Sequence, residues 1–217
     1  MSVKIPNGTT FEIAATLGDA TPFTAITNAN PAVVTAAANG LSDGDVLVVD
    51  SGWAKLSGRP ARVTAAADDS FSLENINTIS LDSYPAGSGA GTYKVATDWT
   101  QIAQITEPAA NGGDQQFLTY GFLEDDDDRQ MPTTKSANSM TLPVADDPSK
   151  DFVAIVEEAD EDKKPRLIRA NLPGGSKIYY YAYVSITATP TLSRNNLMTR
   201  TITLSLASRV TRYNAAA

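Results

Sequence analysis

The stretch KIYYYAYVSI, residues 177–186, places a hydrophobic side chain at every second position from Ile178 onward. Successive side chains of a strand point to opposite faces, so this period of two predicts a β-strand. The stretch TRTITLSLASR, residues 199–209, alternates in the same way. The chain between them contains the pair Asn195-Asn196, which suits a turn. We therefore expect the two stretches to form a long antiparallel hairpin.

The segments before this hairpin extend the predicted sheet. KPRLIRANLPGGSK predicts a further strand that ends in a turn at Pro173–Gly175. DDPSKDFVAIVEEADED carries the i, i+3, i+4 apolar spacing of a helix at Phe152, Ile155 and Val156. Residues that suit a helix N-cap lie just before it, in Asp146–Ser149. We expect one helix of about three turns, packed over the sheet.

The first half of the chain contains a short sequence that occurs twice. VTAAANG at residues 34–40 returns as VTAAADD at residues 63–69, with a strand expected at Asp45–Asp50 between them and another in SFSLENI after them. Two copies are too few for a repeat solenoid, which needs at least three. This half therefore predicts a compact module built of short strands.

The flanks of this module indicate how it joins the rest. TTFEIAAT before it and WTQIAQIT after it are strand-like and are expected to pair, which would bring the two ends of the module together. We therefore predict a discontinuous core, residues 1–22 and 98–217, with an inserted small β module at residues 23–97.

The composition restricts the possible chemistry. The 217 residues include no Cys and no His, which excludes thiol nucleophiles, thiolate metal sites and Ser-His-Asp triads. No apolar run approaches the roughly 18 residues of a membrane helix, and the N-terminal residues lack the basic start and apolar block of a signal peptide. We expect no enzymatic activity, no cofactor, no metal and no membrane partner.

Charge is distributed unevenly along the chain. Residues 163–217 contain nine of the 17 bases and no acid, a net charge of +9, whereas residues 1–162 contain all 25 acids and the other eight bases, a net charge of −17. Either the two parts fold against each other, or subunits meet head to tail with an acidic face on a basic face. Complementary charge of the second kind fixes partner orientation and register.

Five consecutive acids, Glu124 to Asp128, stand at the start of EDDDDRQMPTTK. A calcium loop needs spaced ligands, an invariant glycine and a terminal glutamate, and this run has none of these. We expect this run to lie in a solvated loop rather than in a metal or catalytic site. The glycine-rich GSGAGT at residues 87–92 lacks the Gly-Lys-Ser/Thr ending of a phosphate loop and is expected to be a turn.

The order of these segments resembles a known family. An acidic loop leads into SMTLP, a helix follows, and RANLPGGSKIYYYAYVSI and TRTITLSLASR close the chain. This arrangement, over residues 99–213 and the first 18 residues, resembles the major tail tube proteins of long-tailed, non-contractile, lambda-like bacteriophages (siphoviruses). The resemblance implies a mainly β fold, an antiparallel β-sandwich or half-barrel with one flanking α-helix. The inserted small all-β module is not part of that common core.

The resemblance also implies a function. Such proteins are structural virion proteins that self-assemble into stacked, six-membered (hexameric) rings and form the tail tube, a conduit for delivering the genome into the host. The implied partners are further copies of the chain, the tape-measure protein, the tail terminator and distal tail or baseplate proteins, with double-stranded DNA passing through without specific binding. The implied location is the virion tail, after synthesis in the host bacterial cytoplasm.

The resemblance implies a long loop that reaches the neighbouring ring, and by position this loop is Glu124–Ser139. It assigns a role to the acidic run. Self-repulsion would keep the loop soluble and mobile before assembly, and on stacking the acids would meet basic groups of the next subunit or ring. The residues of this predicted contact are Glu124, Asp125, Asp126, Asp127, Asp128, Arg194, Arg200 and Arg209.

Other functions remain compatible with the sequence. The inserted module, with Trp53 and Tyr84, is a candidate for binding glycans on the host surface. A tail terminator or neck protein of similar fold would have the same strand order. A carboxylate-dependent hydrolase would need two acids that converge in a cleft.

Overall fold

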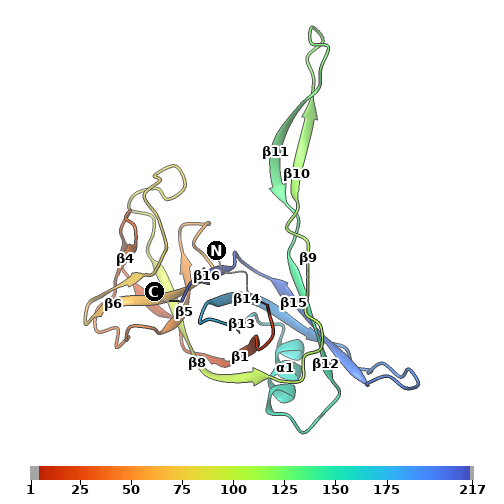
Figure 1. The fold of residues 1–217 in the computed structure, drawn as a ribbon. Helices are drawn as coiled ribbons and strands as arrows, with labels where there is room; N and C mark the ends of the chain where they lie inside the picture. The colour runs from red at the N-terminus through yellow and green to blue at the C-terminus, as the bar shows by residue number, and fades with distance from the viewer. Residues whose placement is uncertain (1–4, 216–217) are drawn as a thin grey trace.

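The computed structural model describes residues 5–215, which fold mainly into antiparallel β-strands (Figure 1). The elements in chain order are β1 (Thr10–Leu17), β2 (Thr21–Phe23), β3 (Ala25–Ile26), β4 (Ala32–Thr35), β5 (Val46–Ser51), β6 (Arg59–Ala67), β7 (Ser70–Leu73), β8 (Gly91–Ile102), β9 (Ala109–Asn111), β10 (Gln115–Tyr120), β11 (Arg129–Lys135), β12 (Ser139–Ala145), α1 (Asp151–Asp162), β13 (Arg166–Asn171), β14 (Lys177–Ile186), β15 (Thr199–Leu206) and β16 (Thr211–Tyr213).

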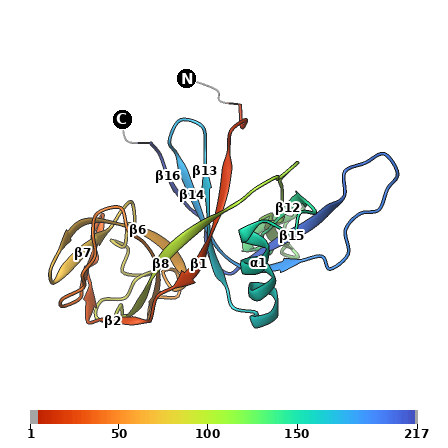
Figure 2. The same ribbon diagram turned by 90° about the horizontal axis from the view of Figure 1, so that it is seen from below.

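Fourteen strands form one sheet. Their order is β3-β4-β7-β6-β5-β8-β1-β13-β14-β15-β12-β9, with β2 also paired to β8 and β16 to β14, while β10 and β11 form a separate two-stranded sheet. The helix α1 packs against β14. In Figure 2, β6 and β7 lie on one side of the β1–β8 pair, and α1, β12 and β15 lie on the other. The predicted mainly β, antiparallel fold with one flanking helix is confirmed.

The predicted hairpin of the C-terminal half is present as β14 and β15, with Val184 opposite Leu204. Its connection passes through Asn195, whose φ of 64° lies in the left-handed region that asparagine tolerates. The preceding strand β13 pairs with β14, with Ile168 opposite Tyr180, as expected. Tyr179 and Tyr180 point to opposite faces of β14 and are both buried, because Tyr180 packs in the core that contains α1 and Tyr179 packs in a second cluster with β5 and β16.

The helix also lies where its apolar spacing places it. Phe152 and Val156 are buried and Ile155 is partly buried. The predicted N-cap is wrong, because the capping position is Lys150 and no side chain caps the helix. Asp147 instead accepts hydrogen bonds from the backbone N–H and the hydroxyl of Ser149, at 3.1 and 2.6 Å. Its carboxylate is therefore used in a local turn, three residues before the capping position.

The two flanks of the first-half module pair as predicted. β1 lies antiparallel to the second half of β8, with Ile13 opposite Thr100. The first half of β8 belongs to the module, where Tyr93 lies opposite Val49 of β5. The division at residues 22/23 and 97/98 therefore falls within β2 and β8, and residues 1–4 of the predicted core lie outside the described residues. The separate domain status of residues 23–97 remains a prediction.

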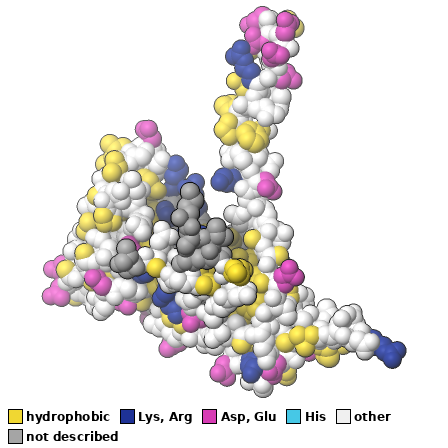
Figure 3. All heavy atoms as spheres, viewed as in Figure 1, with side chains coloured by type: hydrophobic (Ala, Val, Ile, Leu, Met, Phe, Trp, Pro, Cys, Tyr) yellow, Lys and Arg dark blue, Asp and Glu magenta, His cyan; other side chains and the backbone are white. Residues whose placement is uncertain are grey.

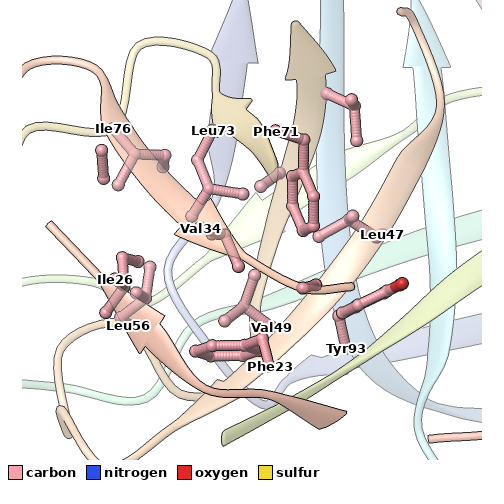
Figure 4. Close-up of a cluster of buried hydrophobic side chains, with 14 of the residues drawn as sticks. Phe23, Ile26, Val34, Leu47, Val49, Leu56, Phe71, Leu73, Ile76 and Tyr93 are labelled. Carbon is pink, nitrogen blue, oxygen red and sulfur yellow. The ribbon is translucent and has the colours of Figure 1, made fainter. Parts of the chain in front are cut away.

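The module has a hydrophobic core of its own (Figure 4). Phe71 and Tyr93 meet edge to face at 5.3 Å between ring centroids, and Val34, Leu47 and Leu73 are fully buried beside them. A second core lies between α1 and the sheet of the C-terminal half. A smaller third cluster connects the two regions through residues of β1, β5, β8, β13, β14 and β16.

The last strand fastens the module to the rest of the chain. The hydroxyl of Tyr213 accepts a hydrogen bond from the backbone N–H of Arg62 at 2.8 Å and donates one to the backbone oxygen of Glu74 at 3.2 Å. The guanidinium of Arg62 lies over the Tyr213 ring, 4.5 Å from its centroid, and pairs with the Glu74 carboxylate. Burial raises the pKa of Tyr213 to about 12, so the phenol stays protonated at any physiological pH.

A charged cluster links β1 to β13. The Glu12 carboxylate accepts hydrogen bonds from Arg169 and from the Asn171 amide. Burial raises the pKa of Glu12, but these two donors, with the charges of Arg169 and Lys177, outweigh it and hold the pKa below its ordinary value of 4.5. The ionised form is therefore favoured by folding.

We expect the change Glu12→Gln to lower the free energy of unfolding at pH 7 by about 1–2 kcal/mol, because it removes a charge-assisted hydrogen bond. The lowered pKa means that the unfolded chain binds more protons below pH 4.5, so the stabilisation is present above that pH and is lost as the pH falls through the folded-state pKa. Urea unfolding at several pH values checks this. Equal loss of stability on acidification in both proteins would contradict it.

Candidate functional site

The hairpin of β10 and β11 projects from the body of the protein (Figure 1). Leu118 of β10 lies opposite Met131 of β11, and every residue of the two strands is exposed except Gln115, which is half-buried. The prediction of a loop over Glu124–Ser139 is therefore wrong for β11, which is a strand throughout. The backbone of β11 is hydrogen-bonded to β10, which makes it a strand. Because neither face of β11 is buried, its sequence does not alternate between apolar and polar residues.

Hydrophobic side chains are exposed along this hairpin (Figure 3). They are Phe117, Leu118, Tyr120, Phe122, Leu123 and Met131. A two-stranded hairpin alone is at best marginally stable in water, and a contiguous exposed apolar patch marks an interaction surface. The hairpin therefore has the properties of an element that is completed by contact with another molecule.

The acidic run lies at the end of the hairpin. The backbone N–H of Asp125 donates to the oxygen of Phe122 at 3.0 Å, which closes a turn with Leu123 at its apex. Asp125 pairs with Arg129 at 2.8 Å. Within residues 5–215, no three acidic side chains are grouped so that they could hold a metal ion. The tip thus combines a fully exposed leucine with a strong excess of negative charge.

Two glycines set the direction in which the hairpin leaves the sheet. Gly112 and Gly113, between β9 and β10, have φ values of 81° and 82°. A Cβ on Gly112 would lie 1.9 Å from the backbone oxygen of Ala137, and one on Gly113 would lie 2.2 Å from the Asn138 side-chain oxygen. Only glycine fits this crossing. The sequence signal for this crossing is the Gly-Gly pair itself.

The basic residues of the predicted contact lie elsewhere. Arg194 lies on the exposed connection between β14 and β15, a second projection that points away from the hairpin (Figure 1). Arg209 is exposed just before β16. Arg200 is engaged within its own chain, because Nη1 contacts Oε1 of Glu157 at 2.8 Å and Nε donates to the oxygen of Thr187 at 2.8 Å. One chain does not bring the acidic tip and these bases together.

A family model described as phage tail tube protein (TTP) matches residues 51–215. The chain belongs to the phage tail tube protein family. The match includes the projecting hairpin, α1 and β13–β16, and it begins inside the predicted inserted module. The resemblance to tail tube proteins is therefore confirmed, and this tail tube protein is a structural component of a phage tail. The long-tailed, non-contractile type of phage remains a prediction.

Solved structures add a distant likeness. The tail tube protein is similar to the tube-terminating cap of the anti-feeding prophage, seen by cryo-electron microscopy, with 23% identity and a TM-score of 0.39 over 53% of this chain and 83% of that chain. A search of curated proteins found no match.

The aromatic residues proposed for glycan binding lie inside the tail tube protein. Trp53 and Tyr84 are buried in the module core, with ring centroids 5.2 Å apart. The indole Nε1 of Trp53 donates to the backbone oxygen of Pro85 at 2.8 Å. Neither ring offers a face on which a sugar could stack. In residues 5–215, no helix combines the length and apolar character needed to cross a membrane.

Proposed function

We propose that this tail tube protein self-assembles into stacked rings, six-membered as its family resemblance implies, and that these form the tube through which the genome passes into the host. The observation that carries the proposal is the β10–β11 hairpin, which extends beyond the body with exposed hydrophobic side chains and pairs with no other strand of residues 5–215. Burial of that surface against neighbouring copies would supply the free energy of assembly.

The ends of the large sheet support lateral contact as well. The sheet ends at β3 and β9, strands of two and three residues. All three residues of β9 are exposed. Short edge strands resist uncontrolled pairing, yet they can join a neighbouring sheet when subunits close into a common barrel.

The charge of the chain suits a conduit for DNA. An excess of 25 acids over 17 bases repels phosphates, whereas a surface rich in Lys and Arg would gain affinity by counterion release and retain the DNA. The proposed partners are the tape-measure protein, the tail terminator and distal tail or baseplate proteins. The proposed location is the virion tail, reached after synthesis in the host cytoplasm.

The acidic tip is proposed to contact bases of another subunit. Arg194 and Arg209 are exposed and suited to this contact. Arg200 would have to exchange its partner Glu157 for an acid of the tip. Each such pair adds orientation and register more than affinity.

Negative-stain electron microscopy and light scattering of the purified, untagged protein test the proposal. We expect tubes with a central channel. The triple variant Phe117→Thr, Leu118→Thr and Met131→Thr should remain monomeric with an unchanged melting temperature, because all three side chains are exposed in the monomer. Leu81→Thr, at an equally exposed leucine of the module, is the matched control and should still assemble.

Two outcomes contradict the proposal. One is a wild-type protein that stays monomeric at every concentration, even beside tape-measure and distal tail proteins. The other is normal tube growth by the triple variant. Single rings that never stack would point instead to a terminator-like role.

A further inference from the structure

A hollow of about 320 Å³ lies at the base of the projecting hairpin, between β9, β12, β14 and β15 and the segment that leads to β16. Its wall is largely apolar, with Met140, Ile178, Leu206 and Val210 among its residues. Val210 is itself partly exposed. The hollow is therefore an apolar surface that the folded monomer leaves open to solvent.

The charge around this hollow is positive. Arg212 is the one charged residue among those of the described chain that line it. Arg209, also exposed, lies three residues earlier. The whole segment 163–217 contains no acid. An occupant of this hollow is thus expected to combine an apolar side chain with negative charge.

A second, larger hollow does not have this character. It measures about 670 Å³ and is lined by residues just before β1 and just after β8, together with Phe11 and Leu172, and Glu107 is the charged residue among them. An acidic occupant would be repelled there. The two hollows therefore differ in the sign of charge that they accept.

The hairpin tip has the chemistry that the hollow at the hairpin base requires. Leu123 is fully exposed at the apex of a turn, a position where polar residues and glycine are usual. Phe122 beside it is half-exposed. The five acids Glu124 to Asp128 follow immediately. This places an apolar knob directly before a cluster of carboxylates.

A hairpin tip that enters this hollow belongs to another copy. β9, the connection at residues 112–114 and β10 together run from Ala109 to Tyr120, twelve residues that span at most roughly 40 Å at about 3.3 Å per residue. The tip therefore lies far from the hollow at its own base (Figure 1). That length carries the tip past the surface of its own subunit, to a neighbouring subunit in an assembly.

We propose that the hollow at the hairpin base receives the hairpin tip of a second copy, with Leu123 inserted between Ile178, Leu206 and Val210 and the tip carboxylates against Arg209 and Arg212. This inference rests on the proposed self-assembly and names its receptor. A knob and a hollow on different parts of one chain form a heterologous contact, which repeats from copy to copy instead of closing as a pair.

A cross-linking experiment tests the contact. The chain has no cysteine, so the double variant Leu123→Cys with Val210→Cys carries only the two introduced thiols. Under mild oxidation of assembled tubes we expect disulfide-linked ladders on a non-reducing gel, because the two Cα atoms would lie within the roughly 4.4–6.8 Å that a disulfide spans. Each single variant should give no ladder. Leu123→Cys with Thr106→Cys, at the acidic hollow, is the matched control and should also give none.

A charge exchange provides an independent readout. Arg209→Glu with Arg212→Glu should raise the critical concentration for assembly about tenfold. Adding Asp126→Lys, Asp127→Lys and Asp128→Lys to the same chain should restore much of it, since residues 124–128 then change from a net charge of −5 to +1 and the sign of both faces is reversed.

The outcomes separate the two proposals. Disulfide-linked ladders, together with restored assembly after the charge exchange, support insertion of the hairpin tip into the hollow at the hairpin base. Tubes that form normally without ladders, or charge exchange without rescue, overturn the hollow but leave self-assembly standing. A wild-type protein that never assembles overturns both.

Discussion

Replacement of Tyr213 by alanine is expected to lower the free energy of unfolding by about 3–5 kcal/mol. The ring is almost fully buried, meets Tyr179 edge to face at 5.7 Å between centroids, and lies under the guanidinium of Arg62. Its removal leaves a cavity where the core sheet and the module meet. It also removes the partner of the Arg62 backbone N–H.

The variant Tyr213→Phe separates the contribution of the ring from that of the hydroxyl. The ring stays in place, but the Arg62 N–H loses its acceptor, so we expect a loss of about 1–2 kcal/mol. Val210→Ala, at a partly exposed position nearby, is the control and should change stability by less than about 1 kcal/mol.

Urea unfolding followed by fluorescence and circular dichroism measures these changes. If Tyr213 joins the module to the core, Tyr213→Ala should also separate the two probes into distinct transitions, a departure from two-state unfolding. A Tyr213→Ala protein that unfolds at the wild-type midpoint would refute the argument.

The interior of the fold was largely readable from the sequence, because burial imposes periodicity. The alternation of residues 177–186 predicted β14, and the spacing of Phe152 and Val156 predicted α1. The pairing of β1 with β8 was also predictable, since both flanks of the module are strand-like. In each case one face of the element is buried, and the apolar residues recur at the spacing of that face.

The projecting hairpin was not readable in this way. β11, with the sequence RQMPTTK, has no buried face and contains Pro132, so it shows neither alternation nor a strong strand propensity. Contacts between residues far apart in the chain could not be predicted from the sequence either. The Tyr213 hydroxyl accepts a hydrogen bond from Arg62, 151 residues away, and Arg200 pairs with Glu157, 43 residues away. The acidic run lies on the surface, as predicted, whereas nothing in the sequence around Leu123 distinguishes an exposed leucine from a buried one.

The replacement Gly112→Ala is expected to abolish assembly while the body of the protein stays folded. Alanine at φ 81° costs about 1–2 kcal/mol in backbone strain, and its Cβ would lie 1.9 Å from the oxygen of Ala137. The two segments that cross at the hairpin base, one with Gly112 and one with Ala137, cannot keep this arrangement. The hairpin must leave the sheet at a different angle, which displaces a tip roughly 40 Å away by many ångströms.

Gly87→Ala is the matched control for this change. Gly87 has nearly the same φ, 77°, but no atom lies within 4 Å of a Cβ placed there. It therefore carries the backbone strain without the collision. We expect Gly87→Ala to assemble normally and Gly112→Ala to remain monomeric, with melting temperatures that differ little, as measured by sedimentation velocity and thermal unfolding. Since both variants bear the same kind of strain, a difference in assembly alone isolates the direction of the hairpin. Equal assembly by both would mean that hairpin direction does not control tube growth.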